Sequence, residues 1–137
     1  MRVYIDTSVV LRVVYHHTGA LATWGQWTTA YASTLWHTEA LRAIDRARLG
    51  GAIGDAQVSQ LRTDIEVIHD HFSLVPLTER ILTRAGESFP TIIGTLDAIH
   101  LATAIHIRDT LGLDAFLTHD TQLATAAVAS GFAVQGV

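Results

Sequence analysis

Short, mostly apolar runs alternate with longer segments of helical pattern along this chain, and this alternation constrains its fold more than any other feature. The runs that we predict to be strands are 3–5, 72–75, 115–118 and 132–135. The segments that we predict to be helices are 7–14, 20–32, 35–49, 55–70, 78–86, 96–111 and 121–130. Short apolar strands joined by helices are typical of a sheet that is buried on both faces. We therefore predict an α/β fold with a mostly parallel central sheet of four to five strands flanked by helices.

Length and composition indicate one ordinary domain spanning residues 1–137. Hydrophobic residues make up 49% of the chain, which is enough for a sizeable core. The absence of cysteine excludes disulfides, thiolate metal sites and cysteine nucleophiles. The apolar N-terminal stretch is interrupted by Asp6 and Arg12, and no uncharged apolar run is long enough to span a bilayer. We therefore expect a cytoplasmic protein with no signal peptide and no membrane segment.

The charged residues exclude several classes of protein that bind or transfer phosphate. Net charge is −4, so any contact with nucleic acid must be local. All 9 basic residues are arginines, and the lack of lysine excludes a P-loop. Receiver domains and haloacid-dehalogenase-type phosphatases also present acids at strand ends, but each normally uses a lysine. The second aspartate of the phosphatase motif is moreover replaced by Ser8.

Two aspartates occupy equivalent places in the predicted fold. Asp6 directly follows the first predicted strand, and Asp120 follows the strand predicted at 115–118. Residues just beyond the carboxyl ends of parallel strands line the ligand crevice of an open sheet. We therefore expect both side chains at one edge of the domain. The alternative is that each is only a helix N-cap, because each precedes a predicted helix.

Two further acids lie on predicted helices. Asp97 falls in the first turn of a mostly apolar helix that Thr95 can cap. Its charge can simply complement the helix dipole, but a carboxylate in a buried setting also needs a partner, and a cation is a natural one. Glu39 has Arg42 three residues later, so the alternative for Glu39 is a surface ion pair.

Four segments of the chain, in order, resemble the PIN-domain ribonucleases, in particular the VapC-type toxins of bacterial toxin–antitoxin pairs. These segments are DTS at 6–8, EALR at 39–42, LDAIHLATA at 96–104 and LTHDTQL at 117–123. Each segment alone is a weak signal, whereas four in order with matching local structure are specific. The resemblance spans essentially the whole chain, although residues 50–90 carry no motif. It implies a single PIN-like domain.

The resemblance further implies RNA phosphodiester hydrolysis that depends on Mg²⁺ or Mn²⁺. Carboxylates are the ligands that such hard cations prefer. The implied catalytic and metal-binding acids are Asp6, Glu39, Asp97 and Asp120. Asp6 and Asp97 would bind metal directly, Asp120 would complete a second position or act through water, and Glu39 would bind metal or orient the attacking water. One metal ion and two metal ions both remain open.

Other side chains at the same rim have supporting roles in this hypothesis. Hydroxyls that would hold waters or carboxylates beside the metal are those of Thr7, Ser8 and Thr118. Arg42 and Arg46 are candidates for binding a substrate phosphate, and Arg42 is equally a candidate counter-charge for Glu39. The implied partners are an RNA substrate, a cognate VapB-like antitoxin and a second copy of the chain in a homodimer.

Two alternative functions remain. One is a catalytically silent PIN-like module that binds RNA or a partner, although the presence of all four acids counts against it. The other is a zinc protein built on the 8 histidines, which show no recognised zinc spacing. His119 is the one histidine that we single out as a possible site residue, because it adjoins Asp120. Trp24, Trp27 and Tyr31, at helical spacing in the predicted helix, are expected in the core or at an interface.

Overall fold

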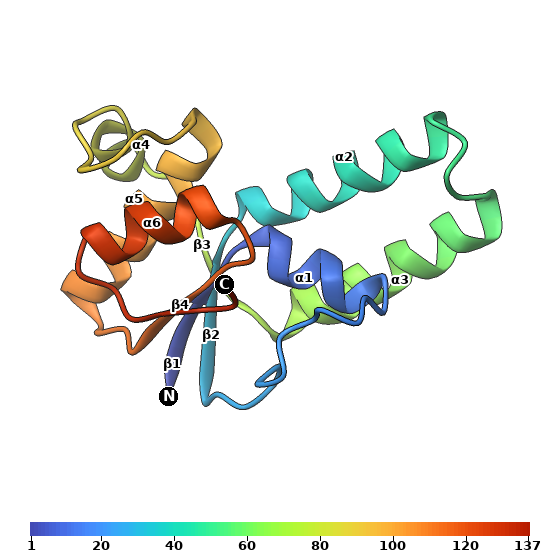
Figure 1. Ribbon diagram of the computed structural model, residues 1–137, viewed down its shortest axis with the longest axis horizontal. Coiled ribbons are helices and arrows are strands. Elements are labelled where there is room, and N and C mark those ends of the chain that lie inside the picture. The colour runs from blue at the N-terminus through green and yellow to red at the C-terminus, as the bar shows by residue number, and fades with distance from the viewer.

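The computed structural model describes all residues, 1–137, and contains six helices and five strands (Figure 1). The strands are β1 (Arg2–Ile5), β2 (Thr29–Ser33), β3 (Ser73–Val75), β4 (Ala115–Leu117) and β5 (Val134–Gln135). The helices are α1 (Thr7–Val14), α2 (Leu35–Leu49), α3 (Asp55–His71), α4 (Glu79–Ala85), α5 (Thr95–Thr110) and α6 (Thr121–Ala129). No helix is both long and apolar enough to cross a membrane.

The strands form one sheet in the order β3-β2-β1-β4-β5, and every neighbouring pair is parallel. Strand β1 is central, with Val3 opposite Ala30 of β2 on one side and opposite Ala115 of β4 on the other. The predicted α/β class and parallel sheet of four to five strands are therefore confirmed.

Successive side chains of the central strands point to opposite faces of the sheet, so the hydrophobic core is divided between the two faces. On β1, Val3 and Ile5 pack in the cluster that includes residues of α1, α2 and α3. Tyr4 points to the opposite face and packs with Phe116 and with residues of α5 and α6. Both faces are thus covered by helices, as a parallel sheet requires. The pair formed by α2 and α3 projects beyond the sheet as a long hairpin (Figure 1).

The helix predicted over 20–32 is wrong. Residues 20–28 form turns, bends and irregular backbone, and residues 29–32 belong to β2, which pairs with β1. Gly25, which adopts φ +81, lies within the turns and is incompatible with a continuing helix. Pairing with the central strand, a contact distant in sequence, therefore decides the conformation of Thr29–Ser33.

The aromatic residues of this segment consequently do not form one helical face. Trp24 and Trp27 meet edge to face, with ring centroids 5.1 Å apart, and pack against the core beneath α1–α3. Tyr31 lies in β2 and packs on the other face of the sheet. All three therefore contribute to the two cores of the chain.

The direction of strand connection reverses beside β1. Chain order runs from β1 to β2 and β3 on one side, whereas β4 and β5 lie on the other side. Such a reversal leaves a crevice outside the carboxyl ends of the adjacent strands. Asp6 follows β1 at this edge, and Asp120 lies just beyond β4. The topology therefore places the two aspartates on either side of the reversal.

Candidate active site

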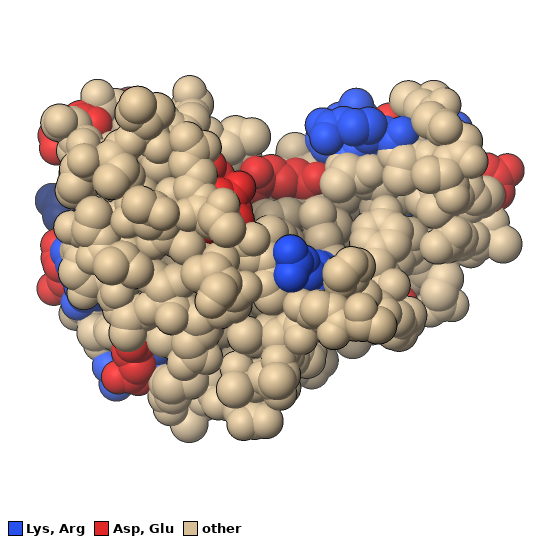
Figure 2. Space-filling model, viewed as in Figure 1, with Lys and Arg blue, Asp and Glu red and all other residues tan.

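All four sequence-predicted acids line a single cleft of about 500 Å³ at this edge. The acids come from the ends of β1 and β4 and from α2 and α5. The cleft is lined by Asp6, Thr7, Ser8, Leu11, Leu35, Thr38, Glu39, Arg42, Ala43, Arg46, Leu96, Asp97 and Asp120. In Figure 2, acidic atoms lie in the hollow between the two halves of the visible face, and basic atoms rise on the side of the α2–α3 hairpin. The cleft thus combines an acidic floor with a basic rim.

Asp6 is nearly fully buried and is held by hydroxyls. Its Oδ2 accepts hydrogen bonds from Ser8 Oγ at 2.5 Å and from Thr118 Oγ1 at 2.9 Å. The same oxygen caps α1 through a longer contact of 3.4 Å with the Ser8 backbone N–H. Its Oδ1 accepts no hydrogen bond and lies 3.6 Å from His100 Nε2. Asp6 is therefore both a helix cap and a lining residue of the cleft.

Asp120, at the start of α6, is likewise both a helix cap and a lining residue of the cleft. Its Oδ1 accepts a hydrogen bond from Leu123 N–H at 2.9 Å, which caps the helix, and its other oxygen is uncommitted. The two predicted alternatives, N-cap and cleft residue, are thus both true of Asp6 and of Asp120. In each carboxylate one oxygen stabilises the local fold and the other remains available.

Glu39 enters the cleft from the second turn of α2. Its Oε1 accepts hydrogen bonds from Thr7 Oγ1 at 2.8 Å and from His100 Nε2 at 2.5 Å. Burial raises the pKa of the Glu39 carboxyl, but the hydrogen bond and charge of His100 and the hydrogen bond from Thr7 outweigh it and lower the pKa overall. Glu39 is therefore held as an anion by donors from α1 and α5.

Arg42 does not neutralise Glu39, so that alternative is wrong. Its Nη1 donates to Asp45 Oδ2 at 2.9 Å, one turn further along the same helix, whereas Glu39 is bonded to Thr7 and His100. Arg42 and Arg46 both line the cleft, and both side chains are exposed. They form its basic rim.

Asp97 lies in the first turn of α5, as predicted, although the N-cap is Gly94 and Thr95 is already helical. The pKa of its carboxyl is raised from 3.8 to about 6, first by burial and then by the charges of Asp120 and Asp6. No hydrogen bond to another side chain offsets these effects. Burial and the nearby charges of Asp120 and Asp6 therefore both disfavour the charged form of Asp97.

Sequence reasoning missed His100, which lies directly beneath these carboxylates. The ring is 0% exposed, with Nε2 bonded to Glu39 and Nδ1 2.7 Å from Tyr4 Oη. Burial lowers the pKa of the imidazole, but Glu39, Asp6 and Asp97 outweigh it and raise the pKa. The available signal was its place three residues after Asp97, because residues at this spacing share one helix face.

The remaining rim residues are largely where the sequence predicts them. Thr7 binds Glu39, and Ser8 and Thr118 bind Asp6. His119 contributes its backbone N–H to Ser8 Oγ at 3.0 Å, but its ring turns away, with Nδ1 2.6 Å from the carbonyl oxygen of Gly136. The His119 side chain therefore does not line the cleft.

The carboxylates share the cleft without forming a preassembled metal site. No group of three or more His, Cys, Asp or Glu side chains in the structure is arranged to hold a metal ion. The donor chemistry nevertheless suits a hard cation, because uncommitted oxygens remain on all four acids and their mutual repulsion is unrelieved. A divalent cation bound among them would relieve the repulsion that raises the pKa of Asp97.

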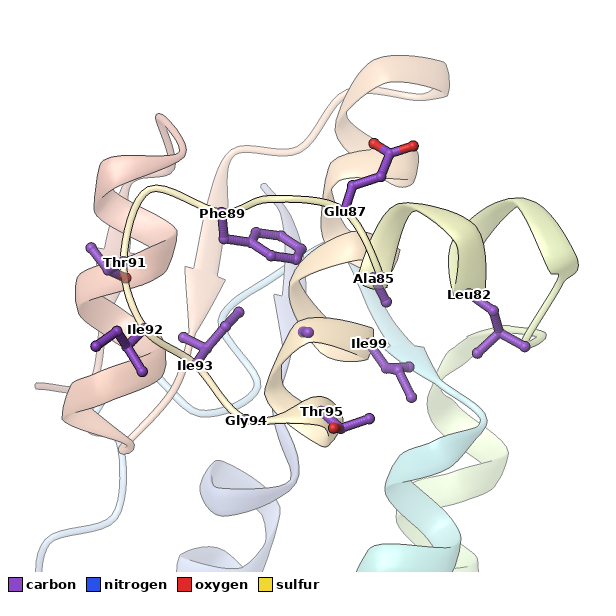
Figure 3. A pocket seen from close by; sticks show the side chains of 12 residues that line it. Leu82, Ala85, Glu87, Phe89, Thr91, Ile92, Ile93, Gly94, Thr95 and Ile99 are labelled. Atoms are coloured by element: carbon purple, nitrogen blue, oxygen red, sulfur yellow. The ribbon is translucent and has the colours of Figure 1, made fainter.

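A second pocket, of about 440 Å³, lies between α4 and the beginning of α5 (Figure 3). Its lining is mainly apolar, with Phe89, Ile93 and Ile99 among the side chains drawn, and Glu87 is its only acid. One acid without a base or a second carboxylate supplies no hydrolytic chemistry. The acidic cleft is therefore the candidate active site.

Comparison with known proteins agrees with this architecture. A model of the PIN domain matches residues 3–129. Ribonuclease VapC47 of Mycobacterium tuberculosis is 31% identical over 137 aligned residues, covering 95% of this chain and 93% of that protein. Among solved structures, VapBC2 from Rickettsia felis bound to a promoter DNA fragment has a TM-score of 0.69 at 12% identity, with 98% of each chain covered. A toxin–antitoxin complex from Klebsiella pneumoniae also has a TM-score of 0.69, at 15% identity and the same coverage. The resemblance of the four sequence segments is thus confirmed, and the chain belongs to the PIN-domain family.

Proposed function

We propose that this protein is a VapC-like endoribonuclease toxin that hydrolyses RNA phosphodiester bonds with the help of Mg²⁺ or Mn²⁺. The observation that carries the proposal is the convergence of Asp6, Glu39, Asp97 and Asp120 in one cleft from four separate segments of the chain. The names of relatives such as ribonuclease VapC47 support it independently.

The bound cation would activate a water molecule and stabilise charge on the attacked phosphate. Asp6 and Asp97 are its direct ligands in this proposal, since Asp6 Oδ1 and both oxygens of Asp97 are uncommitted. Asp120 supplies its free oxygen to a second position or to a bound water. Glu39 binds metal or orients the attacking water through the oxygen that Thr7 and His100 leave free.

The hydroxyls beside the acids fix the geometry of the carboxylates. Thr118 and Ser8 hold Asp6 Oδ2, so Oδ1 is the oxygen left to face a cation. Thr7 does the same for Glu39. Carboxylates that are restrained in this way lose less rotational freedom on binding a metal ion, and outer-shell partners of this kind strongly affect metal affinity.

Arg42 and Arg46 are the candidate contacts for the RNA backbone. They are four residues apart on α2 and therefore lie on one helix face, about 6 Å apart along its axis. Both line the rim of a cleft whose floor is acidic. Because the chain carries a net charge of −4, this local basic rim offsets the repulsion of the RNA backbone from the acidic floor.

The proposal includes a cognate VapB-like antitoxin, a homodimer and action in the cytoplasm. The antitoxin is supported by the similar solved structures, which are VapBC2 with promoter DNA and a toxin–antitoxin complex. The homodimer rests on the family resemblance, and the cytoplasmic location rests on the sequence features that led us to expect it. The alternative of a catalytically silent module is disfavoured by the four retained acids and their shared cleft.

The test is RNA cleavage by purified protein in the presence of Mn²⁺. Wild-type protein should cut cellular RNA and should stop cutting when EDTA is added. Asp6→Asn and Asp97→Asn should each abolish cutting, whereas Asp55→Asn, at an exposed acid in the first turn of α3, should leave cutting unchanged. Undiminished cutting by both cleft variants would refute the proposal. Sequencing the ends of the cut RNA would then identify the substrate.

A further inference from the structure

A chain of buried polar groups runs from β2 through β1 and α5 to the floor of the cleft. The Ser33 backbone N–H donates to Tyr4 Oη at 3.4 Å, and Tyr4 Oη lies 2.7 Å from His100 Nδ1. On the other side of the ring, His100 Nε2 lies 2.5 Å from Glu39 Oε1. Tyr4 and His100 are both 0% exposed. Polar groups buried this deeply are costly unless each one has a partner.

The partners determine the direction of these hydrogen bonds. Tyr4 Oη accepts from a backbone N–H, which can only donate, so the tyrosine hydroxyl proton is free to donate to His100 Nδ1. A ring whose Nδ1 accepts carries its proton on Nε2. That proton faces the carboxylate of Glu39. His100 Nε2 is therefore the donor into the cleft in the neutral ring, and it carries a proton in the charged ring as well.

One nitrogen also lies between the two acids. His100 Nε2 is 2.5 Å from Glu39 Oε1 and 3.6 Å from Asp6 Oδ1. The ring is fully buried and is in edge contact with Tyr4 at a centroid distance of 6.0 Å, so the surrounding core restrains it. The position of His100 thus fixes where the Glu39 carboxylate lies relative to Asp6.

We propose that His100, oriented by Tyr4, is a positioning residue that holds Glu39 beside Asp6, so that the two carboxylates can share a divalent cation. The inference rests on the proposed function, because it assigns the purpose of the pair within the same cleft. Neither residue touches the cation or the RNA. Their contribution is to keep one oxygen of Glu39 occupied and the other available, at a set distance from Asp6 Oδ1.

The variants distinguish the effect of losing a hydrogen-bond donor from the effect of losing the volume of the side chain. Tyr4→Phe removes only the hydroxyl, and Tyr31→Phe is its matched control on the neighbouring strand, because Tyr31 Oη takes no part in the chain of hydrogen bonds. His100→Gln keeps an amide nitrogen near the place of Nε2, whereas His100→Leu removes the donor. Binding of Mn²⁺ to each metal-free protein is measured by titration calorimetry without RNA, and cleavage is measured separately.

Loss of an outer-shell partner typically lowers metal affinity by about 10- to 100-fold. We expect Tyr4→Phe and His100→Leu to weaken Mn²⁺ binding within this range and to lower kcat with little change in KM. His100→Gln should restore most of the affinity lost in His100→Leu, and Tyr31→Phe should behave as wild type. If His100→Leu does not fold, Tyr4→Phe and the histidine tautomer still test the inference. Nitrogen NMR of metal-free wild type should find the His100 proton on Nε2.

Three results would overturn the inference. One is Mn²⁺ affinity and kcat in Tyr4→Phe equal to those of wild type. Another is a His100 Nε2 that carries no proton in the metal-free protein. The third is His100→Gln as impaired as His100→Leu. In all three cases, wild-type protein that binds Mn²⁺ and cuts RNA leaves the proposed function standing. Wild-type protein that does neither refutes the function and the inference together.

Discussion

Replacing Asp97 by Asn should stabilise the metal-free protein while it abolishes RNA cleavage. Asparagine has nearly the same shape as aspartate but carries no charge. The substitution therefore removes the repulsion that Asp97 experiences from Asp120 and Asp6, together with the cost of burying its charge. It also removes a ligand that the proposed function requires.

The magnitude follows from the raised pKa of Asp97. The rise from 3.8 to about 6 corresponds to at most about 3 kcal/mol of destabilisation at neutral pH. Asp97 is only half-buried, and screening by solvent reduces the expected gain to about 1 kcal/mol. For a domain of this size, that gain raises Tm by about 4 °C.

The pH dependence has a definite sign. Because the pKa of Asp97 is raised on folding, its unfavourable contribution is fully present above about pH 6 and fades as the pH falls toward 3.8. The stability difference between Asp97→Asn and wild type should therefore be largest at pH 7.5 and should shrink by pH 4.5. Added Mn²⁺ should stabilise wild type, by about 2.7 kcal/mol at one hundred times its Kd, and should stabilise the variant much less.

Urea unfolding in EDTA at the two pH values measures this difference. Asp55→Asn is the matched control, since Asp55 also lies in the first turn of a helix but is exposed and outside the cleft. Its loss should slightly destabilise the protein, because the helix dipole favours a negative charge there. The reasoning is refuted if Asp97→Asn is less stable than wild type at pH 7.5 in EDTA, or if the difference does not change with pH.

Three further substitutions test separate parts of the structure. Thr118→Val should cost about 1–3 kcal/mol in urea unfolding, because it removes a buried donor to Asp6, and calorimetry should find weaker Mn²⁺ binding. Arg46→Gln should raise KM for RNA and reduce its salt dependence with kcat unchanged, whereas Arg62→Gln on α3 should do neither. Gly136→Ala should lower the free energy of unfolding by about 2 kcal/mol, since its φ is +109 and the new Cβ would lie 2.4 Å from the Thr118 carbonyl oxygen. Equal unfolding midpoints for Gly136→Ala and wild type would contradict this.

The parts of the site that local pattern could predict are those that depend on strand ends. Asp6 and Asp120 follow apolar runs directly, and the edge of a parallel sheet brings such residues together. Glu39 is different, since an acid on a helix with an arginine three residues away has the pattern of a surface ion pair. Its place in the cleft was predicted only from the resemblance of the four segments.

The parts that sequence reasoning missed depend on contacts between distant segments. Strand β2 follows tryptophans at helical spacing, and only pairing with β1 makes it a strand. His100 lies on a largely apolar helix, and its importance comes from Tyr4 on β1 and Glu39 on α2. The residues that flank His100 in the sequence do not predict either of these contacts. Side-chain networks of this kind follow from the tertiary structure and not from local pattern.

The candidate active site forms only when β1 and β4 have paired. The hydrogen bond from Thr118 to Asp6 joins residues 112 positions apart, and the sheet closes between the same two strands. Contacts so far apart in sequence form only after a large loss of chain entropy. A chain caught before this closure lacks both the restrained Asp6 and the neighbouring Asp120. Under the proposed function, a nascent or misfolded copy in which β1 and β4 have not paired would therefore not cut RNA.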